Sequence, residues 1–177
     1  MNRCIPLTRL TALLLLIFIA SPSWGAAQNP DPRIKTKKEV ALEGKTGVPQ
    51  MSVESLKEKM DLNKKYLLLD VRTERERNAG YISGSVWVPR GVLEFKAQTI
   101  CPDADTEIIV YCRKGGRSNL SVKALTALGY THVVNLAGGV NAWGEKGYSL
   151  YNWHGEIKVV GFDRQDPRLA SFDLFKK

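Results

Sequence analysis

The chain has 177 residues, of which 44% are hydrophobic, and its 26 lysines and arginines against 18 aspartates and glutamates give a net charge of +8. A chain of this length can form one modest globular domain with its own hydrophobic core. Apart from residues 35–38 and a loop near residue 113, the cations are scattered instead of being gathered with aromatic residues on one face. This argues against a nucleic-acid-binding protein and favours a role for the charge in solubility and in attracting anionic substrates.

The first 25 residues have the pattern of a secretory signal peptide. Arg3 and Arg9 precede an apolar run over residues 10–20, and small residues follow that run. A basic start, a short apolar core and small residues are typical of a signal that is cleaved, here after Gly25 or Ala27. The apolar run is also short for a membrane span. We therefore expect an exported protein without a stable membrane anchor after cleavage, periplasmic if the source is bacterial.

Residues 26–50 are rich in proline, glycine and charge, and we expect them to form a mobile lead-in. A domain over residues 51–150 follows, in which short apolar runs alternate with segments of helical spacing. Such alternation predicts an α/β fold, with a central parallel sheet flanked by helices on both faces. The strands are expected over residues 66–71, 85–88, 107–111 and 132–136, and the helices over residues 53–60, 73–78, 91–98, 118–128 and 140–146. Ser52 is expected to cap the first of these helices.

Residues 151–177 are expected to form a C-terminal extension of this domain. The apolar residues within 157–162 predict an additional edge strand. Trp153, Phe172 and Phe175 are expected to pack back onto the core, because exposed aromatic clusters are unusual without a partner. Contact with a partner protein is the alternative for these three side chains.

The most informative stretch of the sequence is the loop that starts at Cys112. The β-branched and apolar residues 107–111 predict a buried parallel strand before the loop, and residues 118–128 predict a helix after it. Ser118 is expected to be the N-cap of this helix, and Gly129 to end it. Cys112 is therefore expected at the carboxyl end of a strand and facing a helix N-terminus, where open α/β sheets bind ligands.

The loop is strongly positive. It carries Arg113, Lys114 and Arg117 next to the expected helix N-terminus. Each of these charges favours the thiolate over the thiol, so the cysteine is predicted to be nucleophilic, with a lowered pKa. The two glycines between the cations leave room for an anion against the backbone. A buried structural cysteine is the alternative, but it does not account for three adjacent cations.

After removal of the signal, two cysteines and two histidines remain, and they indicate neither a disulfide nor a metal site. Cys101 precedes the strand over residues 107–111, and Cys112 follows it. Five extended residues span about 16 Å, whereas a disulfide needs Cα atoms about 5.5 Å apart, so we predict no disulfide. No Cys-x-x-Cys motif is present, and His132 and His154 lack partners at ligand spacing, so no metal or other cofactor is expected.

Four motifs occur in order along residues 51–150. They are Leu68-Leu69-Asp70-Val71-Arg72, then Glu76 with Ala79-Gly80-Tyr81-Ile82-Ser83-Gly84-Ser85, then the loop from Cys112 to Ser118, and last Leu136-Ala137-Gly138-Gly139-Val140-Asn141-Ala142-Trp143. Together they resemble the motifs of a single-domain rhodanese, a sulfurtransferase. The resemblance implies that Cys112 forms a persulfide, that Asp70 pairs with a basic loop residue, and that Arg72 and Glu76 support the motif structurally. The substrate-binding residues that it implies are Arg113, Lys114, Gly115, Gly116, Arg117 and Ser118.

The loop also narrows the chemistry that the resemblance implies. The run Cys-Arg-Lys-Gly resembles the loops of thiosulfate-preferring members of the family. Four residues separate Cys112 from Arg117, whereas cysteine-dependent phosphatases have one residue more, which makes a wider cradle for phosphate. This difference argues against phosphatase or arsenate reductase activity. Tyr81 and Arg77 depart from the family pattern, at positions that are not catalytic in the family.

The expected function is the transfer of sulfane sulfur from thiosulfate, a small anionic donor, to cyanide or a thiol through a Cys112 persulfide. The alternative is a persulfide carrier or a partner-binding module in a sulfur relay or oxidation pathway, with a protein as the sulfur acceptor. A catalytically silent module is disfavoured, because the cysteine and its cationic loop are both present.

Overall fold

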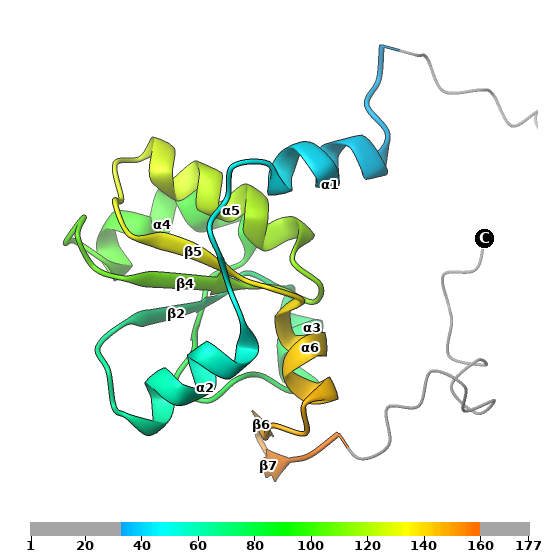
Figure 1. The fold of residues 1–177 in the computed structure, drawn as a ribbon, viewed down its shortest axis with the longest axis vertical. Helices are drawn as coiled ribbons and strands as arrows, with labels where there is room; N and C mark the ends of the chain where they lie inside the picture. Colours follow the sequence, from blue (N-terminus) through cyan, green and yellow to red (C-terminus); the bar gives the residue numbers. More distant parts are fainter. Residues whose placement is uncertain (1–32, 160–177) are drawn as a thin grey trace, which may run out of the picture. The chain divides into compact units, whose positions relative to one another are not determined.

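A computed structural model of the protein describes residues 33–159, and the architecture below is that of the compact unit that begins at Lys35. Its centre is a five-stranded parallel sheet in the order β1-β5-β4-β2-β3 (Figure 1). The strands are β1 (Gln50–Met51), β2 (Leu67–Asp70), β3 (Val86–Trp87), β4 (Ile108–Tyr111) and β5 (Val133–Leu136). The predicted α/β class with a central parallel sheet is confirmed.

Helices cover both faces of this sheet, as predicted. One face carries α1 (Lys37–Lys45), α4 (Leu93–Ile100) and α5 (Gly116–Ala127), and a short 3-10 turn, η1 (Arg90–Val92), leads into α4 (Figure 1). The other face carries α2 (Val53–Asp61) and α6 (Gly139–Glu145). The short helix α3 (Glu74–Asn78) follows β2 and shares a small hollow with α6. Ser52 caps α2 as predicted, since its hydroxyl accepts from the N–H of Ser55.

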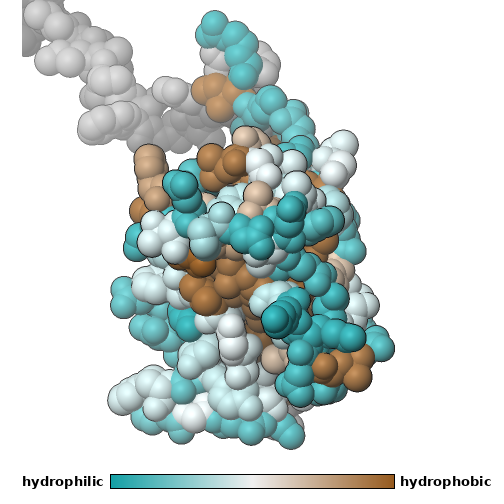
Figure 2. Space-filling view, turned by 90° about the vertical axis from the view of Figure 1, so that its left-hand side faces the viewer, coloured by the Kyte–Doolittle hydropathy of each residue, from teal (hydrophilic) through white to brown (hydrophobic). Residues whose placement is uncertain are grey.

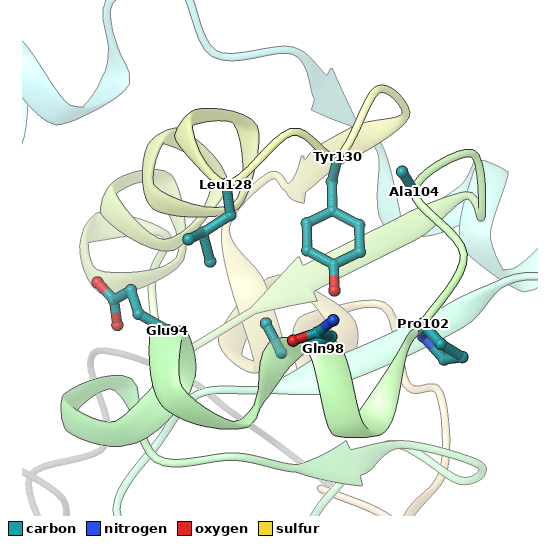
Figure 3. A pocket seen from close by; sticks show the side chains of 7 residues that line it. Glu94, Gln98, Pro102, Ala104, Leu128 and Tyr130 are labelled. Atoms are coloured by element: carbon teal, nitrogen blue, oxygen red, sulfur yellow. The ribbon is translucent and has the colours of Figure 1, made fainter.

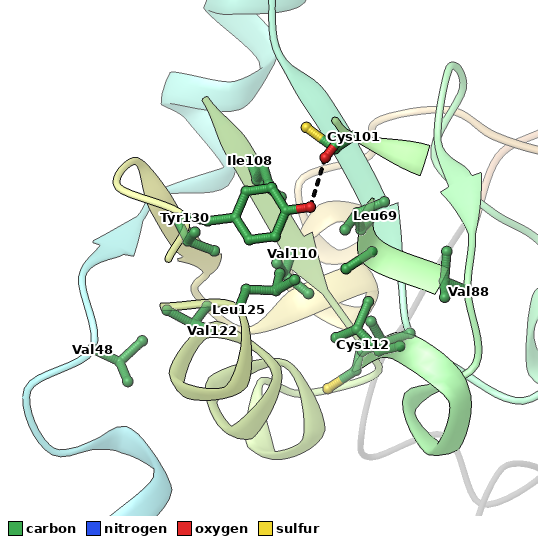
Figure 4. Close-up of a cluster of buried hydrophobic side chains, with 14 residues drawn as sticks. Val48, Leu69, Val88, Cys101, Ile108, Val110, Cys112, Val122, Leu125 and Tyr130 are labelled. Atoms are coloured by element: carbon green, nitrogen blue, oxygen red, sulfur yellow. Dashed lines mark hydrogen bonds between the residues drawn. The ribbon is translucent and has the colours of Figure 1, made fainter. Parts of the chain in front are cut away.

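The central strand β4 shows why the chain forms two hydrophobic cores. Ile108 and Val110 point to the face of α4 and α5, and Ile109 and Tyr111 point to the face of α2 and α6. All four side chains are buried, because helices cover both faces of the sheet. This is why the sequence of the strand is a continuous apolar run without alternating polar residues. Figure 4 shows the first of these clusters, with Cys112 at one end and Cys101 at the other.

Part of the segment expected to be a mobile lead-in is a helix. Thr36 and Glu39 form a capping box at the start of α1, in which each side chain accepts from the backbone N–H of the other residue. The helix lies along α5, and a methyl group built on its buried Gly44 would be 3.0 Å from Leu120 Cδ2. The expectation is therefore wrong for residues 37–45. The sequence conceals this helix because it contacts the domain through a glycine and leaves its other side chains exposed.

Residues 150–157 form a hairpin instead of extending the main sheet. β6 (Leu150–Asn152) pairs antiparallel with β7 (Gly155–Ile157), and Tyr81 bridges to Tyr151. The predicted edge strand is thus wrong for residues 157–159, since residue 157 pairs within the hairpin. Trp153 is 84% exposed at the hairpin turn, with its ring centroid 3.9 Å from that of His154, and does not pack onto the core. Phe172, Phe175 and the predicted signal peptide lie outside the described residues.

Figure 2 shows the face of the molecule opposite to α3 and α6, at the amino ends of the strands. This face is largely hydrophilic, with hydrophobic residues gathered in a patch near its middle. A hollow of about 400 Å³ at the start of β5 is lined by Pro49, Glu107, Thr131, His132, Val133 and Val134. Within residues 33–159, no helix combines the length and the apolar character needed to cross a bilayer.

Candidate active site

Cys112 lies in a short loop between β4 and α5 that curls around its sulfur. The residue is only 2% exposed. Its Sγ accepts a hydrogen bond from the backbone N–H of Gly115, with an N···S distance of 3.2 Å, and the hydroxyl oxygen of Ser118 lies 3.4 Å away. Gly115 has a φ of 107°, a left-handed conformation that glycine adopts more readily than other residues. The backbone at this point forms a cradle of donors around the sulfur atom.

The helix after the loop begins two residues earlier than predicted. α5 starts at Gly116, with Gly115 as its N-cap, so the prediction of Ser118 as N-cap is wrong. Ser118 is instead fully buried in the first turn, where its hydroxyl faces Cys112 and β5. The glycines allow the helix to start directly beside the sulfur. At the other end Gly129 follows the C-cap with a φ of 102°, which confirms its predicted role in ending the helix.

The surroundings of Cys112 favour a thiolate. Burial disfavours the charge and on its own would raise the pKa of the thiol. Hydrogen bonds from the side chain and backbone of Ser118 and from the backbone N–H groups of Gly115 and Lys114 outweigh this effect, so the pKa of Cys112 is lowered from its ordinary value of 9.0. The N-terminus of α5 adds a partial positive charge at the same point. A buried cysteine with these neighbours is suited to nucleophilic attack.

Arg113 and Lys114 form the outer rim of the loop. Both residues are exposed, and neither side chain makes an ion pair with any other described residue. Their charges are therefore available to an incoming anion. The arrangement separates two tasks within the loop, because the backbone donors face the sulfur atom and the free cations face the solvent.

Arg117 connects the loop to α3. Its guanidinium donates to both carboxylate oxygens of Glu76, at 2.6 Å and 2.7 Å. The hydrogen bond from Arg117, with further ones from Thr73, overcomes partial burial and holds the pKa of Glu76 at about 2, against an ordinary value of 4.5. The same hydrogen bond to Glu76 raises the pKa of the Arg117 guanidinium, and the nearby Cys112 adds to this effect. Glu76 thus supports the loop by direct contact, and not only its own motif.

Asp70 does not pair with a residue of the loop, so that expectation is wrong. Its buried carboxylate accepts instead from Arg72, at 2.6 Å to Nη2 and 2.9 Å to Nε, and from the hydroxyl of Tyr111 at 2.9 Å. Arg72 continues to the carbonyl oxygens of Glu76 and Gly80. The reason is topological: Asp70 lies on the α2 and α6 face of the sheet with Tyr111, whereas Cys112 points to the opposite face.

The start of α6 closes over the loop from the other side. The backbone N–H of Val140 donates to the carbonyl of Cys112 at 2.9 Å, and that of Asn141 donates to the carbonyl of Arg113 at 3.1 Å. Gly139 makes this approach possible, since a methyl group built on it would lie 2.2 Å from the Cys112 oxygen. Its φ of 59° also favours glycine. The fourth sequence motif therefore fixes the backbone of the reactive loop.

Comparison with known proteins accounts for this geometry. The profile of the rhodanese-like domain family matches residues 52–146, more than half of the chain. The chain belongs to the rhodanese-like domain family. It is 33% identical to a sulfurtransferase of Allochromatium vinosum over 103 residues, which cover 58% of this chain and 94% of that protein.

Two other matches give the range of proteins that share the domain. The chain is 30% identical over 105 residues to a putative sulfur carrier protein of Bacillus subtilis, covering 59% of this chain and 56% of that longer protein. Among solved structures, a Rhodopseudomonas palustris protein of unknown function, described as a possible tyrosine phosphatase, superposes with a TM-score of 0.61. It is 26% identical, and the match covers 69% of this chain and 98% of that one. The relatives at sequence level support sulfur transfer in general.

Three polar residues of this rhodanese-like domain escaped the sequence analysis. Tyr111 reads as part of an apolar strand, yet its hydroxyl joins Asp70, Ser85 and the backbone N–H of Ile82. Asn135 and Gln50 lie behind the loop and contact each other through their amides at 2.6 Å. The signal for Asn135 was present in the sequence, because a lone amide in an otherwise apolar strand needs a buried partner.

Two hollows lie apart from the sulfur. One of about 150 Å³ adjoins Glu76, the partner of Arg117. It is lined by Arg72, Glu76, Ala79, Gly80, Val140, Asn141, Gly144, Leu150 and Val159. The other, of about 360 Å³, lies between α4 and the end of α5 and is lined by Glu94, Ala97, Gln98, Pro102, Ala104, Leu128 and Tyr130 (Figure 3). Neither is lined by a residue of the Cys112 loop. In the described part of the chain, no cluster of three or more His, Cys, Asp or Glu residues could hold a metal ion.

Cys101 lies away from this chemistry. It is buried at the end of α4, its Sγ contacts the carbonyl of Asp103, and its own carbonyl accepts from the hydroxyl of Tyr130 (Figure 4). Both Cys101 and Cys112 are free thiols. As the sequence predicts, Cys101 precedes β4 and Cys112 follows it, at opposite ends of the cluster.

Proposed function

We propose that this protein is a sulfurtransferase that takes sulfane sulfur from thiosulfate and passes it to a thiol, or to cyanide in an assay, through a persulfide on Cys112. The observation that carries the proposal is the environment of one sulfur atom. Cys112 Sγ accepts from the N–H of Gly115 at 3.2 Å, and the exposed Arg113 and Lys114 follow it in the loop without an ion-pair partner within residues 33–159. These features suit a bound sulfur anion and a small dianionic donor.

The reaction has two half-reactions. The thiolate of Cys112 attacks the outer sulfur of thiosulfate, a new S–S bond forms, and the S–S bond of thiosulfate breaks with its electron pair leaving on sulfite. Arg113 and Lys114 offset the charge that builds on the departing sulfite. In the second half-reaction a nucleophile attacks the terminal sulfur of the persulfide and regenerates the thiolate. The scheme requires ping-pong kinetics.

The loop favours this chemistry over phosphate hydrolysis. Both terminal nitrogens of the Arg117 guanidinium donate to Glu76, at 2.6 Å and 2.7 Å, so its positive charge is already balanced by a carboxylate and is less suited to holding a phosphate. The loop is also one residue shorter than that of cysteine-dependent phosphatases. We expect no turnover of an aryl phosphate by the purified protein, even though one structural neighbour is described as a possible phosphatase.

A sulfur carrier is the second candidate, because one relative is a putative sulfur carrier protein. A carrier uses the same persulfide but releases it only to a protein acceptor. Turnover separates the two roles: an enzyme regenerates free Cys112 repeatedly with thiosulfate and a small thiol, whereas a carrier stops after one sulfur atom per chain. We propose a periplasmic location on the basis of the predicted signal peptide, to be checked by sequencing the amino end of the exported protein.

Intact-mass measurement before and after thiosulfate tests the proposal. We expect the protein to gain the mass of one sulfur atom and to lose it on addition of cyanide. Cys112→Ser should gain nothing, and Cys101→Ser, which removes the other described thiol, should behave as the parent. Sulfur transfer by Cys112→Ser would show that the persulfide scheme is wrong.

A further inference from the structure

A row of buried side chains connects the Cys112 loop to β1. Ser118 Oγ lies 2.5 Å from the Oδ1 of Asn135, and the Nδ2 of Asn135 lies 2.6 Å from the Oε1 of Gln50. Gln50 Nε2 then contacts the backbone carbonyl of Val48 at 3.0 Å and the side chain of Asn119 at 2.9 Å. Ser118 and Asn135 are 0% and 1% exposed, so water does not substitute for these contacts near the loop.

The carbonyl of Val48 sets the direction of every hydrogen bond in this row. A carbonyl oxygen can only accept, so the Gln50 atom beside it must be the amide nitrogen, and Oε1 must face Asn135. Asn135 therefore presents its own amide nitrogen to Gln50 and its oxygen to Ser118. That oxygen can only accept as well, so the hydroxyl proton of Ser118 is directed to Asn135.

This direction creates a competition, because a serine hydroxyl has one proton. Ser118 Oγ lies 2.5 Å from Asn135 Oδ1, 3.1 Å from the carbonyl of Gly115 and 3.4 Å from Cys112 Sγ. We propose that Asn135, oriented by Gln50, is a positioning residue that draws the Ser118 proton toward itself, weakens the hydrogen bond from Ser118 to the Cys112 sulfur, and so keeps the sulfur more basic than it would be with that hydrogen bond at full strength. The backbone N–H groups of the loop, that of Gly115 at 3.2 Å among them, remain the donors that stabilise the anion.

The competition bears on both halves of the proposed sulfur transfer, and this part of the inference rests on the proposed function. A more basic thiolate is a better nucleophile toward the sulfur donor, whereas a less basic one is a better leaving group when the persulfide is discharged. Asn135 therefore speeds the loading of sulfur and slows its release. The Ser118 proton is the adjustable element, since the backbone donors are fixed by the fold.

The test is the pH dependence of Cys112 alkylation by iodoacetamide in the full-length protein, resolved by peptide mass spectrometry. Gln50→Leu is the informative variant, because Gln50 is at the exposed end of the row and touches neither Ser118 nor Cys112. Without Gln50 the Asn135 amide can reverse, and the Ser118 proton can turn to the sulfur. We expect the apparent pKa of Cys112 to fall by about one unit, the scale of a hydrogen bond to a charged group.

Three controls make the test specific. Asn135→Leu, which removes the acceptor at similar volume, should give the same fall. Gln98→Leu on α4, an exposed glutamine outside the row, should leave the pKa unchanged. In a Ser118→Ala background, Gln50→Leu should have no effect, because no hydroxyl proton remains to be redirected. The charged pair that faces the thiol, Arg117 with Glu76, is intact in every variant.

An unchanged or raised pKa in Gln50→Leu overturns the inference, and so does a fall that persists without Ser118. Alkylation does not involve sulfur transfer, so the two proposals can fail separately. A protein that forms no persulfide but shows the Ser118-dependent shift refutes the proposed function alone. A protein that forms the persulfide but lacks the shift refutes only the role of Asn135.

Discussion

The ion pair between Arg117 and Glu76 joins the reactive loop to α3 through two side chains. It is bidentate and partly withdrawn from water, with side-chain exposures of 36% and 28%. Its geometry orients the guanidinium more strictly than a single contact would. Because Arg117 lies in the first turn of α5, directly after the loop, the pair ties the position of α3 to the loop that holds the sulfur.

Glu76→Gln should lower the stability of the protein and slow the formation of the persulfide on Cys112. We expect a loss of roughly 1 kcal/mol of unfolding free energy, the upper range for partly exposed ion pairs. We also expect slower persulfide formation, measured by intact mass in samples quenched at successive times after thiosulfate is added. Glu94→Gln is a matched control, since it breaks the ion pair between Glu94 on α4 and Arg90 in η1, outside the loop. Equal rates of persulfide formation in Glu76→Gln and the parent would contradict a role of the Arg117–Glu76 ion pair in shaping the loop.

The same pair predicts the acid limit of the fold. The pKa of Glu76 is about 2 when folded and 4.5 in its ordinary state, so its ionised form stabilises the folded protein fully above pH 4.5. This contribution is lost as the pH falls from 4.5 through about 2. We expect the free energy of unfolding, measured with urea, to depend less on pH in Glu76→Gln than in the parent across this window. A parallel decline in both proteins would assign the acid sensitivity to other groups.

At the scale of elements, the reactive loop is held between two helix starts, α5 and α6. The contact with α6 depends on Gly139, whose position leaves no room for a side chain against the Cys112 and Arg113 backbone. The loop is thus shaped as much by residues near 139 as by its own sequence. This explains why a motif near the end of the domain belongs with a cysteine that precedes it in the chain.

Gly139→Ala is predicted to displace the loop and abolish persulfide formation. The strained φ and the forced shift of packed backbone should together cost about 2–5 kcal/mol of unfolding free energy. Gly147→Ala is the matched control, because Gly147 also has a positive φ of 72° but no atom within 4 Å of the added methyl group. Thermal melts and mass analysis of both variants give the comparison. Persulfide formation in Gly139→Ala to the same extent as in the parent would contradict the requirement for close packing of residue 139 against the loop backbone.

At the scale of the whole molecule, a buried polar cluster around Asp70 connects β2, β4 and the segment after α3. Tyr111 is its centre, since its hydroxyl donates toward Asp70 and accepts from the N–H of Ile82 at 3.2 Å. Burial and the Asp70 charge raise the pKa of Tyr111, so it stays protonated and neutral. The cluster therefore ties the sheet together without taking part in the chemistry of the opposite face.

Tyr111→Phe should destabilise the protein without changing the reactivity of its thiol. The variant leaves the buried N–H of Ile82 without its acceptor, a cost of about 1–3 kcal/mol. Tyr66→Phe, which removes a hydroxyl from a partly buried tyrosine at the edge of the same core, should cost less. Chemical denaturation measures both. A shift in the pH profile of Cys112 alkylation in Tyr111→Phe would show that the two faces are coupled.

The sequence predicted the parts of the fold that depend on local signals and failed where distant residues decide. The apolar strands, the Ser52 cap and the Gly129 helix end follow from neighbouring residue types, and all are present. The position of Ser118 was predicted wrongly because it depends on a distant residue. Its hydroxyl bonds to Asn135 on β5, inside the first turn of the helix, instead of capping the helix. The Asp70 partner was misassigned because pairing depends on which face of the sheet a side chain meets.

The two outermost strands of the sheet, β1 and β3, have two residues each. Pro49 stands directly before β1, and Pro89 follows shortly after β3. Edges this short, flanked by residues that lack an N–H, give another chain almost no backbone ladder to extend, which protects against edge-to-edge aggregation. A protein that receives sulfur from Cys112 would then have to recognise this one through side chains around the loop, and not by adding a strand to its sheet.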